Sequence, residues 1–154
     1  MKESKILLIE DDPDHADLII NALKSEEIDN EDTEIILIKD GKDAIDYFQK
    51  NDLSEKSDLA GVYSDDEEFF QIELILLDIN LPKINGIDVL KCIRMNPKYY
   101  STPVTILSTN SNDDTIEEAY RQGADGFIKK HGSYEKLAEN LKILRNSFTK
   151  SYAL

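Results

Sequence analysis

The sequence predicts an α/β fold in which five parallel strands form one sheet with helices on both faces. Two features of the chain support this class. Short continuous apolar runs recur, as expected for strands that are buried on both faces of a parallel sheet. Segments with apolar residues at helical spacing separate these runs, so strands and helices alternate. The length of 154 residues fits a single domain with a sizeable core.

The predicted strands are the apolar runs themselves, and polar residues end most of them abruptly. They are expected at about 5–9, 35–38, 74–77, 104–107 and 126–129. Right-handed crossovers between parallel strands favour the flavodoxin-like order 2-1-3-4-5. This order places the first and third strands side by side, so Glu10 and Asp11 come next to Asp78.

The predicted helices carry apolar side chains three or four residues apart. Asp12-Pro13 supplies an N-cap and a first-turn proline for the first helix, which is expected to reach about Ser25. Gly123 fits the C-terminal cap of the fourth helix. The inward-facing sets are Ala16, Ile20 and Leu23; Ala44, Ile45 and Phe48; Ile87, Leu90 and Ile93; Ile116, Ala119 and Tyr120; and Tyr134, Leu137, Leu141, Leu144 and Phe148.

Residues 1–154 are expected to form one domain with a single long interruption. The segment 51–72 is strongly acidic and contains one lysine, Lys56, so we expect a long acidic connection there. A partner-specific docking element, supported by Val62, Tyr63, Phe69 and Phe70, is the alternative. The tail from about residue 150 is expected to be frayed.

Composition excludes several classes of function. A formal charge of −14 should repel nucleic acid and anionic membrane surfaces. No apolar stretch approaches the length of a membrane span, and the first residues lack the apolar core of a signal peptide. The only cysteine is Cys92, so an internal disulfide is impossible and a reducing compartment is indicated. We therefore expect a cytoplasmic protein without membrane insertion or nucleic-acid binding.

Carboxylates gather at one edge of the predicted sheet, because the carboxyl ends of parallel strands meet there. Glu10 and Asp11 follow the first strand, and Asp78 follows the third. Converging carboxylates repel one another, and Mg²⁺ relieves that repulsion with few protein ligands and several waters. We expect Asp11 and Asp78 to bind the ion directly and Glu10 to act directly or through water. The backbone carbonyl of Asn80 is a further expected ligand.

The other residues at this edge suit phosphoryl chemistry. A carboxylate such as Asp78 can attack phosphorus and form an aspartyl phosphate. Lys130 follows the fifth strand and can pair with phosphoryl oxygens, and Ser108 ends the fourth strand and can hydrogen-bond them. Taken singly, these residues are also explained as helix caps or solvated charges. Polar residues at four strand ends on one edge are hard to attribute to capping alone.

Two histidines, His15 and His131, lie near these strand ends in the sequence. Their separation gives no metal-ligand spacing. We expect both side chains to be exposed to solvent.

The polar residues of this edge form an ordered set of motifs along the chain. The set consists of Glu10-Asp11, Leu77-Asp78-Ile79-Asn80-Leu81-Pro82, Asn85-Gly86, Ser108, Gly123-Ala124-Asp125-Gly126-Phe127 and Lys130. With it the chain resembles the receiver domain of two-component response regulators over about residues 5–148. Each motif alone is weak evidence, whereas the ordered set is specific.

The resemblance implies that a sensor histidine kinase, or a phosphotransfer protein, passes a phosphoryl group from a phosphohistidine to Asp78. Lys130 and Ser108 then re-form around the phosphate, and Phe127 turns inward as Ser108 moves. The site is thereby coupled to the face made by the fourth helix, the fifth strand and the fifth helix. That face can contact a downstream protein partner or a second copy of the chain. Such a protein is not an enzyme beyond its own phosphotransfer and dephosphorylation.

The chain departs from the family pattern after the lysine, where His131 replaces the usual proline. This departure and the long acidic connection resemble single-domain regulators that pair with bacterial phytochrome-type histidine kinases. With no effector domain after residue 154, output is expected through protein contact or onward phosphotransfer. Asn80, Thr109 and Asn110 are expected to line the path of water to phosphorus. Many receivers have a smaller residue at the position of Thr109, so a long-lived phosphoryl group is expected.

Two alternative functions belong to other classes of protein. A haloacid-dehalogenase-like magnesium phosphatase also has a nucleophilic aspartate after a strand, but it needs a second acid two residues later. Asn80 occupies that position and cannot protonate a leaving group. The other alternative is an interaction module that works without phosphorylation, and the intact set of acids and lysine argues against it.

Overall fold

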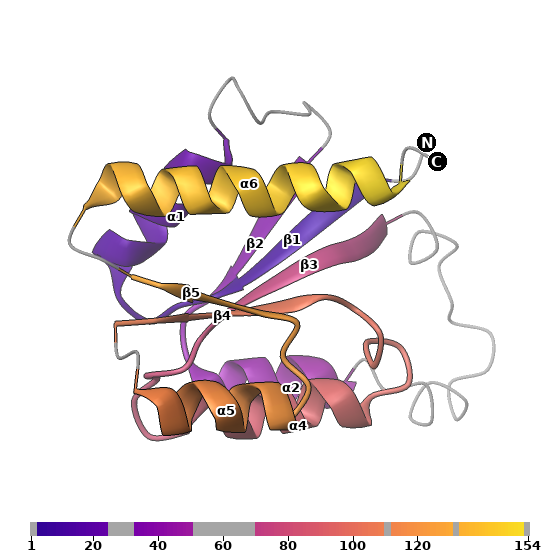
Figure 1. The fold of residues 1–154 in the computed structure, drawn as a ribbon. Helices are drawn as coiled ribbons and strands as arrows, with labels where there is room; N and C mark the ends of the chain where they lie inside the picture. Colours follow the sequence, from indigo (N-terminus) through magenta and orange to yellow (C-terminus); the bar gives the residue numbers. More distant parts are fainter. Residues whose placement is uncertain (1–2, 25–32, 51–69, 110–111, 131–132, 153–154) are drawn as a thin grey trace.

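The computed structural model describes residues 3–24, 33–50, 70–109, 112–130 and 133–152. Within these ranges five strands alternate with five helices and form three layers (Figure 1). The strands are β1 (Glu3–Ile9), β2 (Thr33–Ile38), β3 (Phe70–Asp78), β4 (Val104–Ser108) and β5 (Gly126–Lys129). All four pairings are parallel, and the strand order β2-β1-β3-β4-β5 confirms the predicted flavodoxin-like topology.

The helices cover both faces of the sheet. They are α1 (Pro13–Leu23), α2 (Gly41–Lys50), α4 (Gly86–Met95), α5 (Asp113–Arg121) and α6 (Tyr134–Tyr152). The pair α1 and α6 lies on one face, and α2, α4 and α5 lie on the other (Figure 1). The fourth and fifth predicted helices are therefore α5 and α6. No helix in the described ranges is long and apolar enough to cross a membrane.

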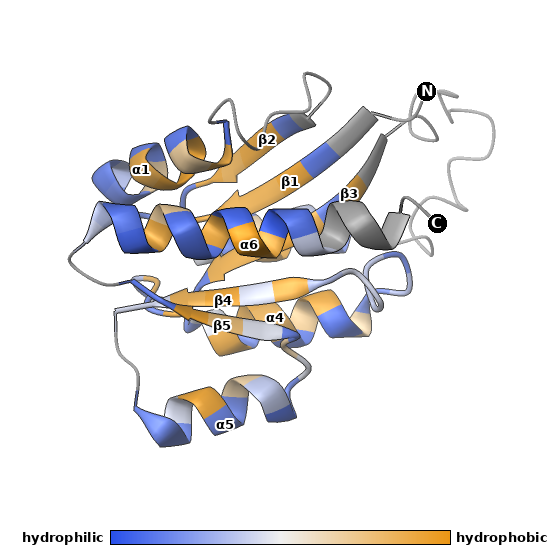
Figure 2. Cartoon of the chain, turned by 45° about the horizontal axis from the view of Figure 1, so that its top comes forward, coloured by the Kyte–Doolittle hydropathy of each residue, from blue (hydrophilic) through white to orange (hydrophobic). Residues whose placement is uncertain are grey.

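Apolar side chains form two clusters, one on each face of the sheet. Successive side chains of a strand point to opposite faces, so β3 contributes to both. Ile75 and Leu77 pack towards α2 and α4, whereas Leu74 and Leu76 pack towards α1 and α6. Figure 2 shows the central strands as mostly hydrophobic and the outer surface of α6 as largely hydrophilic. Burial of each such side chain stabilises the fold by about 1.5–3 kcal/mol, which holds the strand ends in a fixed arrangement.

The structure corrects the predicted start of the third strand. β3 begins at Phe70, because residues 70–72 continue the pairing with residues 3–5 of β1. The register shifts between Lys5 and Ile6, where Glu73 is the extra residue of β3. Residues 70–72, which were predicted to belong to the acidic connection, are therefore part of β3. Residues 51–69 lie outside the described ranges.

Two helix predictions also need correction. The tail is helical as far as Tyr152, since neither glycine nor proline interrupts α6 after Tyr134. Tyr120 was expected to face inward, but it is 47% exposed. Ala119 occupies the buried position of α5, and the next residue is turned by about 100° around a helix of 3.6 residues per turn. The end of α1 at Leu23 lies close to the predicted one.

Candidate functional site at the carboxyl edge of the sheet

The carboxyl ends of the strands bring the predicted site residues together. Main-chain hydrogen bonds continue past the strand ends and fix their relative positions. The Lys130 amide donates to the Ser108 carbonyl at 2.7 Å, and the Glu10 amide donates to the Ile38 carbonyl at 3.0 Å. Ile79, directly after Asp78, donates to the Leu107 carbonyl at 3.1 Å. The side chains at this edge are therefore carried by a rigid, hydrogen-bonded backbone.

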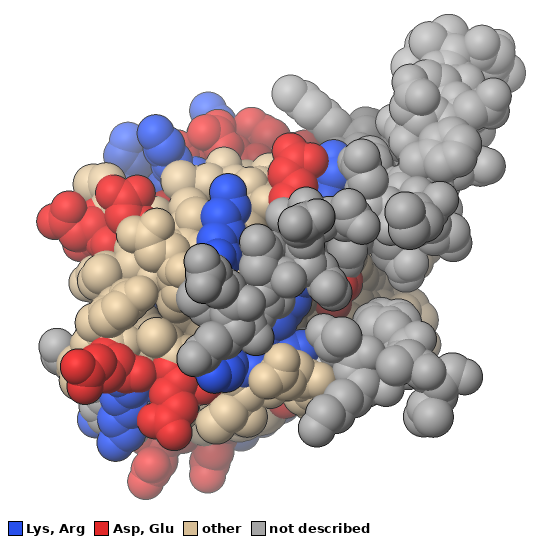
Figure 3. Space-filling view, turned by 90° about the horizontal axis from the view of Figure 1, so that it is seen from above, with Lys and Arg blue, Asp and Glu red and all other residues tan. Residues whose placement is uncertain are grey.

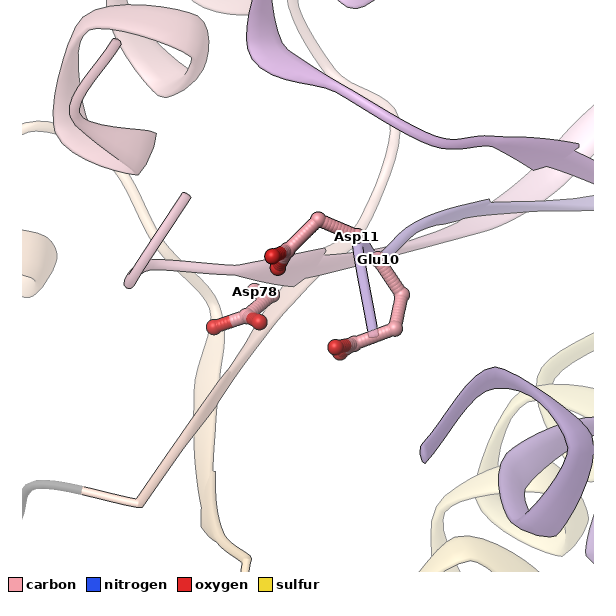
Figure 4. Close-up of side chains that lie close together, drawn as sticks. All are labelled: Glu10, Asp11 and Asp78. Carbon is pink, nitrogen blue, oxygen red and sulfur yellow. The ribbon is translucent and has the colours of Figure 1, made fainter. Parts of the chain in front are cut away.

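Three carboxylates lie close together at this edge. One ligand oxygen from each of Glu10, Asp11 and Asp78 lies within 4.8 Å of the others. Glu10 and Asp11 leave the end of β1, and Asp78 leaves the neighbouring end of β3 (Figure 4). Glu10 and Asp78 are buried, whereas Asp11 is exposed. Hard carboxylate oxygens next to solvent fit a Mg²⁺ or Mn²⁺ ion, which binds through a few carboxylates and retains water ligands.

Lys130 is the cation that faces these carboxylates. Its side chain is buried, and Nζ donates to Glu10 Oε2 at 2.5 Å and to Asp78 Oδ2 at 3.1 Å. Burial raises the pKa of Glu10 to about 7, although the hydrogen bond from Lys130 works in the opposite direction. The ammonium therefore offsets the mutual repulsion of the two buried carboxylates.

Ser108 and Asn80 form the opposite side of the site. Ser108 is fully buried, and its Oγ accepts a hydrogen bond of 3.0 Å from the side-chain amide of Asn80. The same Nδ2 atom lies 3.4 Å from Thr109 Oγ1. The backbone amide of Asn80 donates to Asp78 Oδ1 at 2.9 Å. Asn80 thus connects the β3 carboxylate with the hydroxyls of Ser108, the last residue of β4, and Thr109, the next residue.

Gly86 explains the Asn85-Gly86 motif in physical terms. A Cβ atom at Gly86 would lie 2.5 Å from the Ile79 Cα and 2.7 Å from the Asp78 carbonyl oxygen. The Gly86 amide donates to the Ile79 carbonyl at 3.1 Å, and Asn85 Oδ1 caps α4 by accepting from the Ile87 amide at 2.9 Å. The glycine therefore lets α4 start directly against the backbone that carries Asp78.

A cavity of about 560 Å³ lies beside the connection between β3 and α4. Residues of the β3–α4 connection, among them Asn80 and Lys83, form one wall, and Asp114 and Glu118 of α5 form another. Lys83 adopts a left-handed conformation with φ of 68°.

Phe127 of β5 pairs with Ile106 and is half-buried against the cluster that faces α2 and α4.

His15 belongs to the site, although the sequence pattern predicted only an exposed side chain. Its imidazole is 38% exposed, and Nδ1 lies 3.3 Å from Lys130 Nζ and 3.7 Å from Glu10 Oε1. The signal in the sequence is its place in the first turn of the helix that follows Glu10-Asp11. Asp12 caps that helix as predicted, accepting from the Asp14 and His15 amides. Asn110 and His131 lie outside the described ranges.

The family of the chain follows from comparison with known proteins. The profile of the response regulator receiver domain matches residues 6–142. The chain therefore belongs to the response regulator receiver family, as the ordered motifs indicated. This membership supports a receiver over the phosphatase alternative.

Two relatives resemble the chain over nearly its whole length. Response regulator Rcp1 of Synechocystis sp. is 29% identical over 149 residues, which are 97% of this chain and 91% of Rcp1. A Mn²⁺-bound crystal structure of Rcp1 matches with a TM-score of 0.70, and the aligned part covers 91% of this chain and 90% of the Rcp1 chain. The phosphorylated cyanobacterial phytochrome response regulator RcpA is 28% identical with a TM-score of 0.76, covering 98% of this chain and 96% of its own.

Proposed function

We propose that the chain accepts a phosphoryl group on Asp78 and thereby switches its contacts with another protein. The observation that carries this proposal is the pairing of buried Lys130 with both Asp78 and Glu10 beside exposed Asp11. An ammonium next to a strand-end carboxylate can neutralise charge that develops on a transferring phosphoryl group. A receiver implies a histidine kinase or a phosphotransfer protein as the donor.

In the proposed transfer, the P–N bond of a donor phosphohistidine breaks as a P–O bond forms to a carboxylate oxygen of Asp78. Asp11 and Asp78 would hold Mg²⁺, with the Asn80 carbonyl as a further ligand and Glu10 acting directly or through water. When bound, Mg²⁺ supplies positive charge for the phosphoryl oxygens. Rcp1 has a Mn²⁺-bound form, which supports a divalent ion as a ligand of this chain as well.

After transfer, Lys130 would keep an ion pair with the phosphoryl group and Ser108 would donate a hydrogen bond to it. Ser108 Oγ accepts from the Asn80 side chain, and its own O–H would be the donor to the phosphoryl group. Phe127 would turn further inward as Ser108 moves. The added charge, nearly two units, is enough to bias such a two-state element.

The proposed output surface is formed by α5, β5 and α6. The switch residue Phe127 lies in its strand, β5. It would bind a downstream protein or a second copy of the chain. Similarity to the phytochrome response regulator RcpA supports a phytochrome-type histidine kinase as the donor. Figure 3 views the face of the molecule that carries α1 and α6. Its described part shows both acidic and basic side chains, so a protein that binds this face would meet a mixed pattern of charges rather than a uniformly acidic surface.

We further propose that residues 1–154 work as one receiver unit in the cytoplasm. Apart from its own phosphorylation and dephosphorylation, this unit would catalyse no reaction. The acidic excess of −14 argues against nucleic acid as a partner.

Intact-mass measurement after incubation with acetyl phosphate and Mg²⁺ tests the phosphoacceptor. The wild-type chain should gain one phosphoryl mass, and Asp78→Asn should gain none. Asp88→Asn, an exposed aspartate on α4, is the matched control and should be phosphorylated like wild type. Phosphorylation of Asp78→Asn would refute the assignment. A wild-type chain that takes up no phosphoryl group would favour the interaction module that works without phosphorylation.

A further inference from the structure

Lys130 directs its ammonium at three acceptors, one of which no motif of the chain accounts for. An ammonium has three N–H donors. Nζ lies 2.5 Å from Glu10 Oε2, 3.1 Å from Asp78 Oδ2 and 3.3 Å from His15 Nδ1. The side chain is buried, so water cannot easily replace an acceptor that is lost. His15 therefore completes the coordination of the cation that faces the phosphoacceptor.

The position of His15 is fixed by the start of α1. Asp12 Oδ1 accepts from the Asp14 amide at 2.9 Å and from the His15 amide at 3.2 Å. The following residue, Ala16, is buried against the sheet. The imidazole thus projects from an anchored first turn, and in its Nε2–H tautomer Nδ1 can accept from Lys130. Its partial exposure does not weaken this argument, because Nδ1 faces the buried ammonium.

We propose that His15 is a positioning residue for phosphoryl transfer, which acts by holding Lys130 towards Asp78. This inference rests on the proposed function. With only two carboxylates as acceptors, the ammonium would be drawn to Glu10, its closer partner. The third contact, on the α1 side, fixes the rotation of the N–H groups and keeps one of them on Asp78 Oδ2. Loss of the imidazole acceptor should therefore slow phosphorylation by roughly threefold to tenfold, the range expected for one net hydrogen bond.

Three variants separate hydrogen bonding from packing. His15→Leu keeps much of the volume and removes the acceptor, whereas His15→Asn keeps an acceptor oxygen near the position of Nδ1. Asn21→Ala, an exposed residue further along α1, is the matched control. The phosphorylation rate with acetyl phosphate is measured at saturating Mg²⁺ and at the same pH for all variants.

We expect His15→Leu to be slow and both His15→Asn and Asn21→Ala to be close to wild type. Magnesium affinity, titrated separately, should be unchanged in all three variants. Equal rates for His15→Leu and wild type would overturn the inference. So would an equal loss of rate in His15→Leu and His15→Asn, since the packing of the ring would then be the cause.

A second measurement reports on the ammonium without phosphorylation. Solvent exchange of the Lys130 Nζ protons, followed by ¹⁵N NMR, should be roughly threefold or more faster in His15→Leu than in wild type and His15→Asn. Unchanged exchange in His15→Leu would refute the contact. If the wild-type chain took up no phosphoryl group, the proposed function would fail, and the exchange rates would still decide whether His15 holds Lys130.

Discussion

Lys130 donates a hydrogen bond of 2.5 Å to Glu10, a residue 120 positions earlier in the chain. This contact gives the two members of the acidic pair different surroundings. Glu10 is buried and engaged by the ammonium, whereas Asp11 is exposed and reaches further from the end of β1. A metal ion arriving from solvent therefore meets Asp11 without having to displace a lysine.

The first prediction concerns this difference. Asp11→Ala should weaken Mg²⁺ binding by about tenfold or more, and Glu10→Ala should weaken it less. The reason is that Asp11 offers an unengaged carboxylate, while Glu10 already neutralises Lys130. Titration of Mg²⁺ by calorimetry measures both variants, with Asp88→Ala as a control for loss of a distant carboxylate. Coinciding curves for the two variants would show that the direct ligand has been misassigned.

The second prediction concerns pH and follows from the buried position of Glu10. Its pKa is raised from 4.5 to about 7 in the folded protein. Between these values the folded state binds more protons than the unfolded state, so the free energy of unfolding falls as pH rises. This contribution of Glu10 is fully present below pH 4.5 and is lost as pH rises through about 7.

Glu10→Gln isolates that contribution, because glutamine does not titrate. Urea denaturation without divalent ions, at about pH 5 and about pH 8, should show wild type losing stability relative to Glu10→Gln as pH rises. Asp88→Asn should leave the pH dependence of wild type unchanged. A constant difference between wild type and Glu10→Gln would mean that the pKa of Glu10 lies in its usual range.

The third prediction concerns the lifetime of the phosphoryl group. Thr109 is exposed next to Ser108, and its Oγ1 lies 3.4 Å from Asn80 Nδ2. Both side chains are expected to narrow the path by which water reaches phosphorus in line. Thr109→Ala should therefore speed dephosphorylation severalfold, measured as phosphate release at fixed Mg²⁺ concentration.

Thr102→Ala, which lies before β4 at the opposite end of that strand from Ser108, serves as a control with the same change of side chain. A decay in Thr109→Ala that is unchanged or slower than in wild type would remove the steric argument. A slow decay in wild type suits a relay protein or an adaptor that must diffuse to its partner.

The sequence by itself determined the class of fold and the edge that carries the site. Apolar runs and helical spacings are local patterns, so they located all five strands and the five described helices. Parallel strands with right-handed crossovers then left few possible orders. The polar residues at the strand ends, from Asp78 to Lys130, followed directly from where the apolar runs stop.

Only the tertiary structure decided which of these side chains touch. The start of β3 at Phe70 depends on pairing with β1, and the exposure of Tyr120 depends on how α5 sits on the sheet. The contact of His15 with Lys130 joins residues 115 positions apart. Such contacts depend on strand register, helix rotation and side-chain rotamers together, because burial and hydrogen bonding are properties of the assembled fold rather than of any local segment.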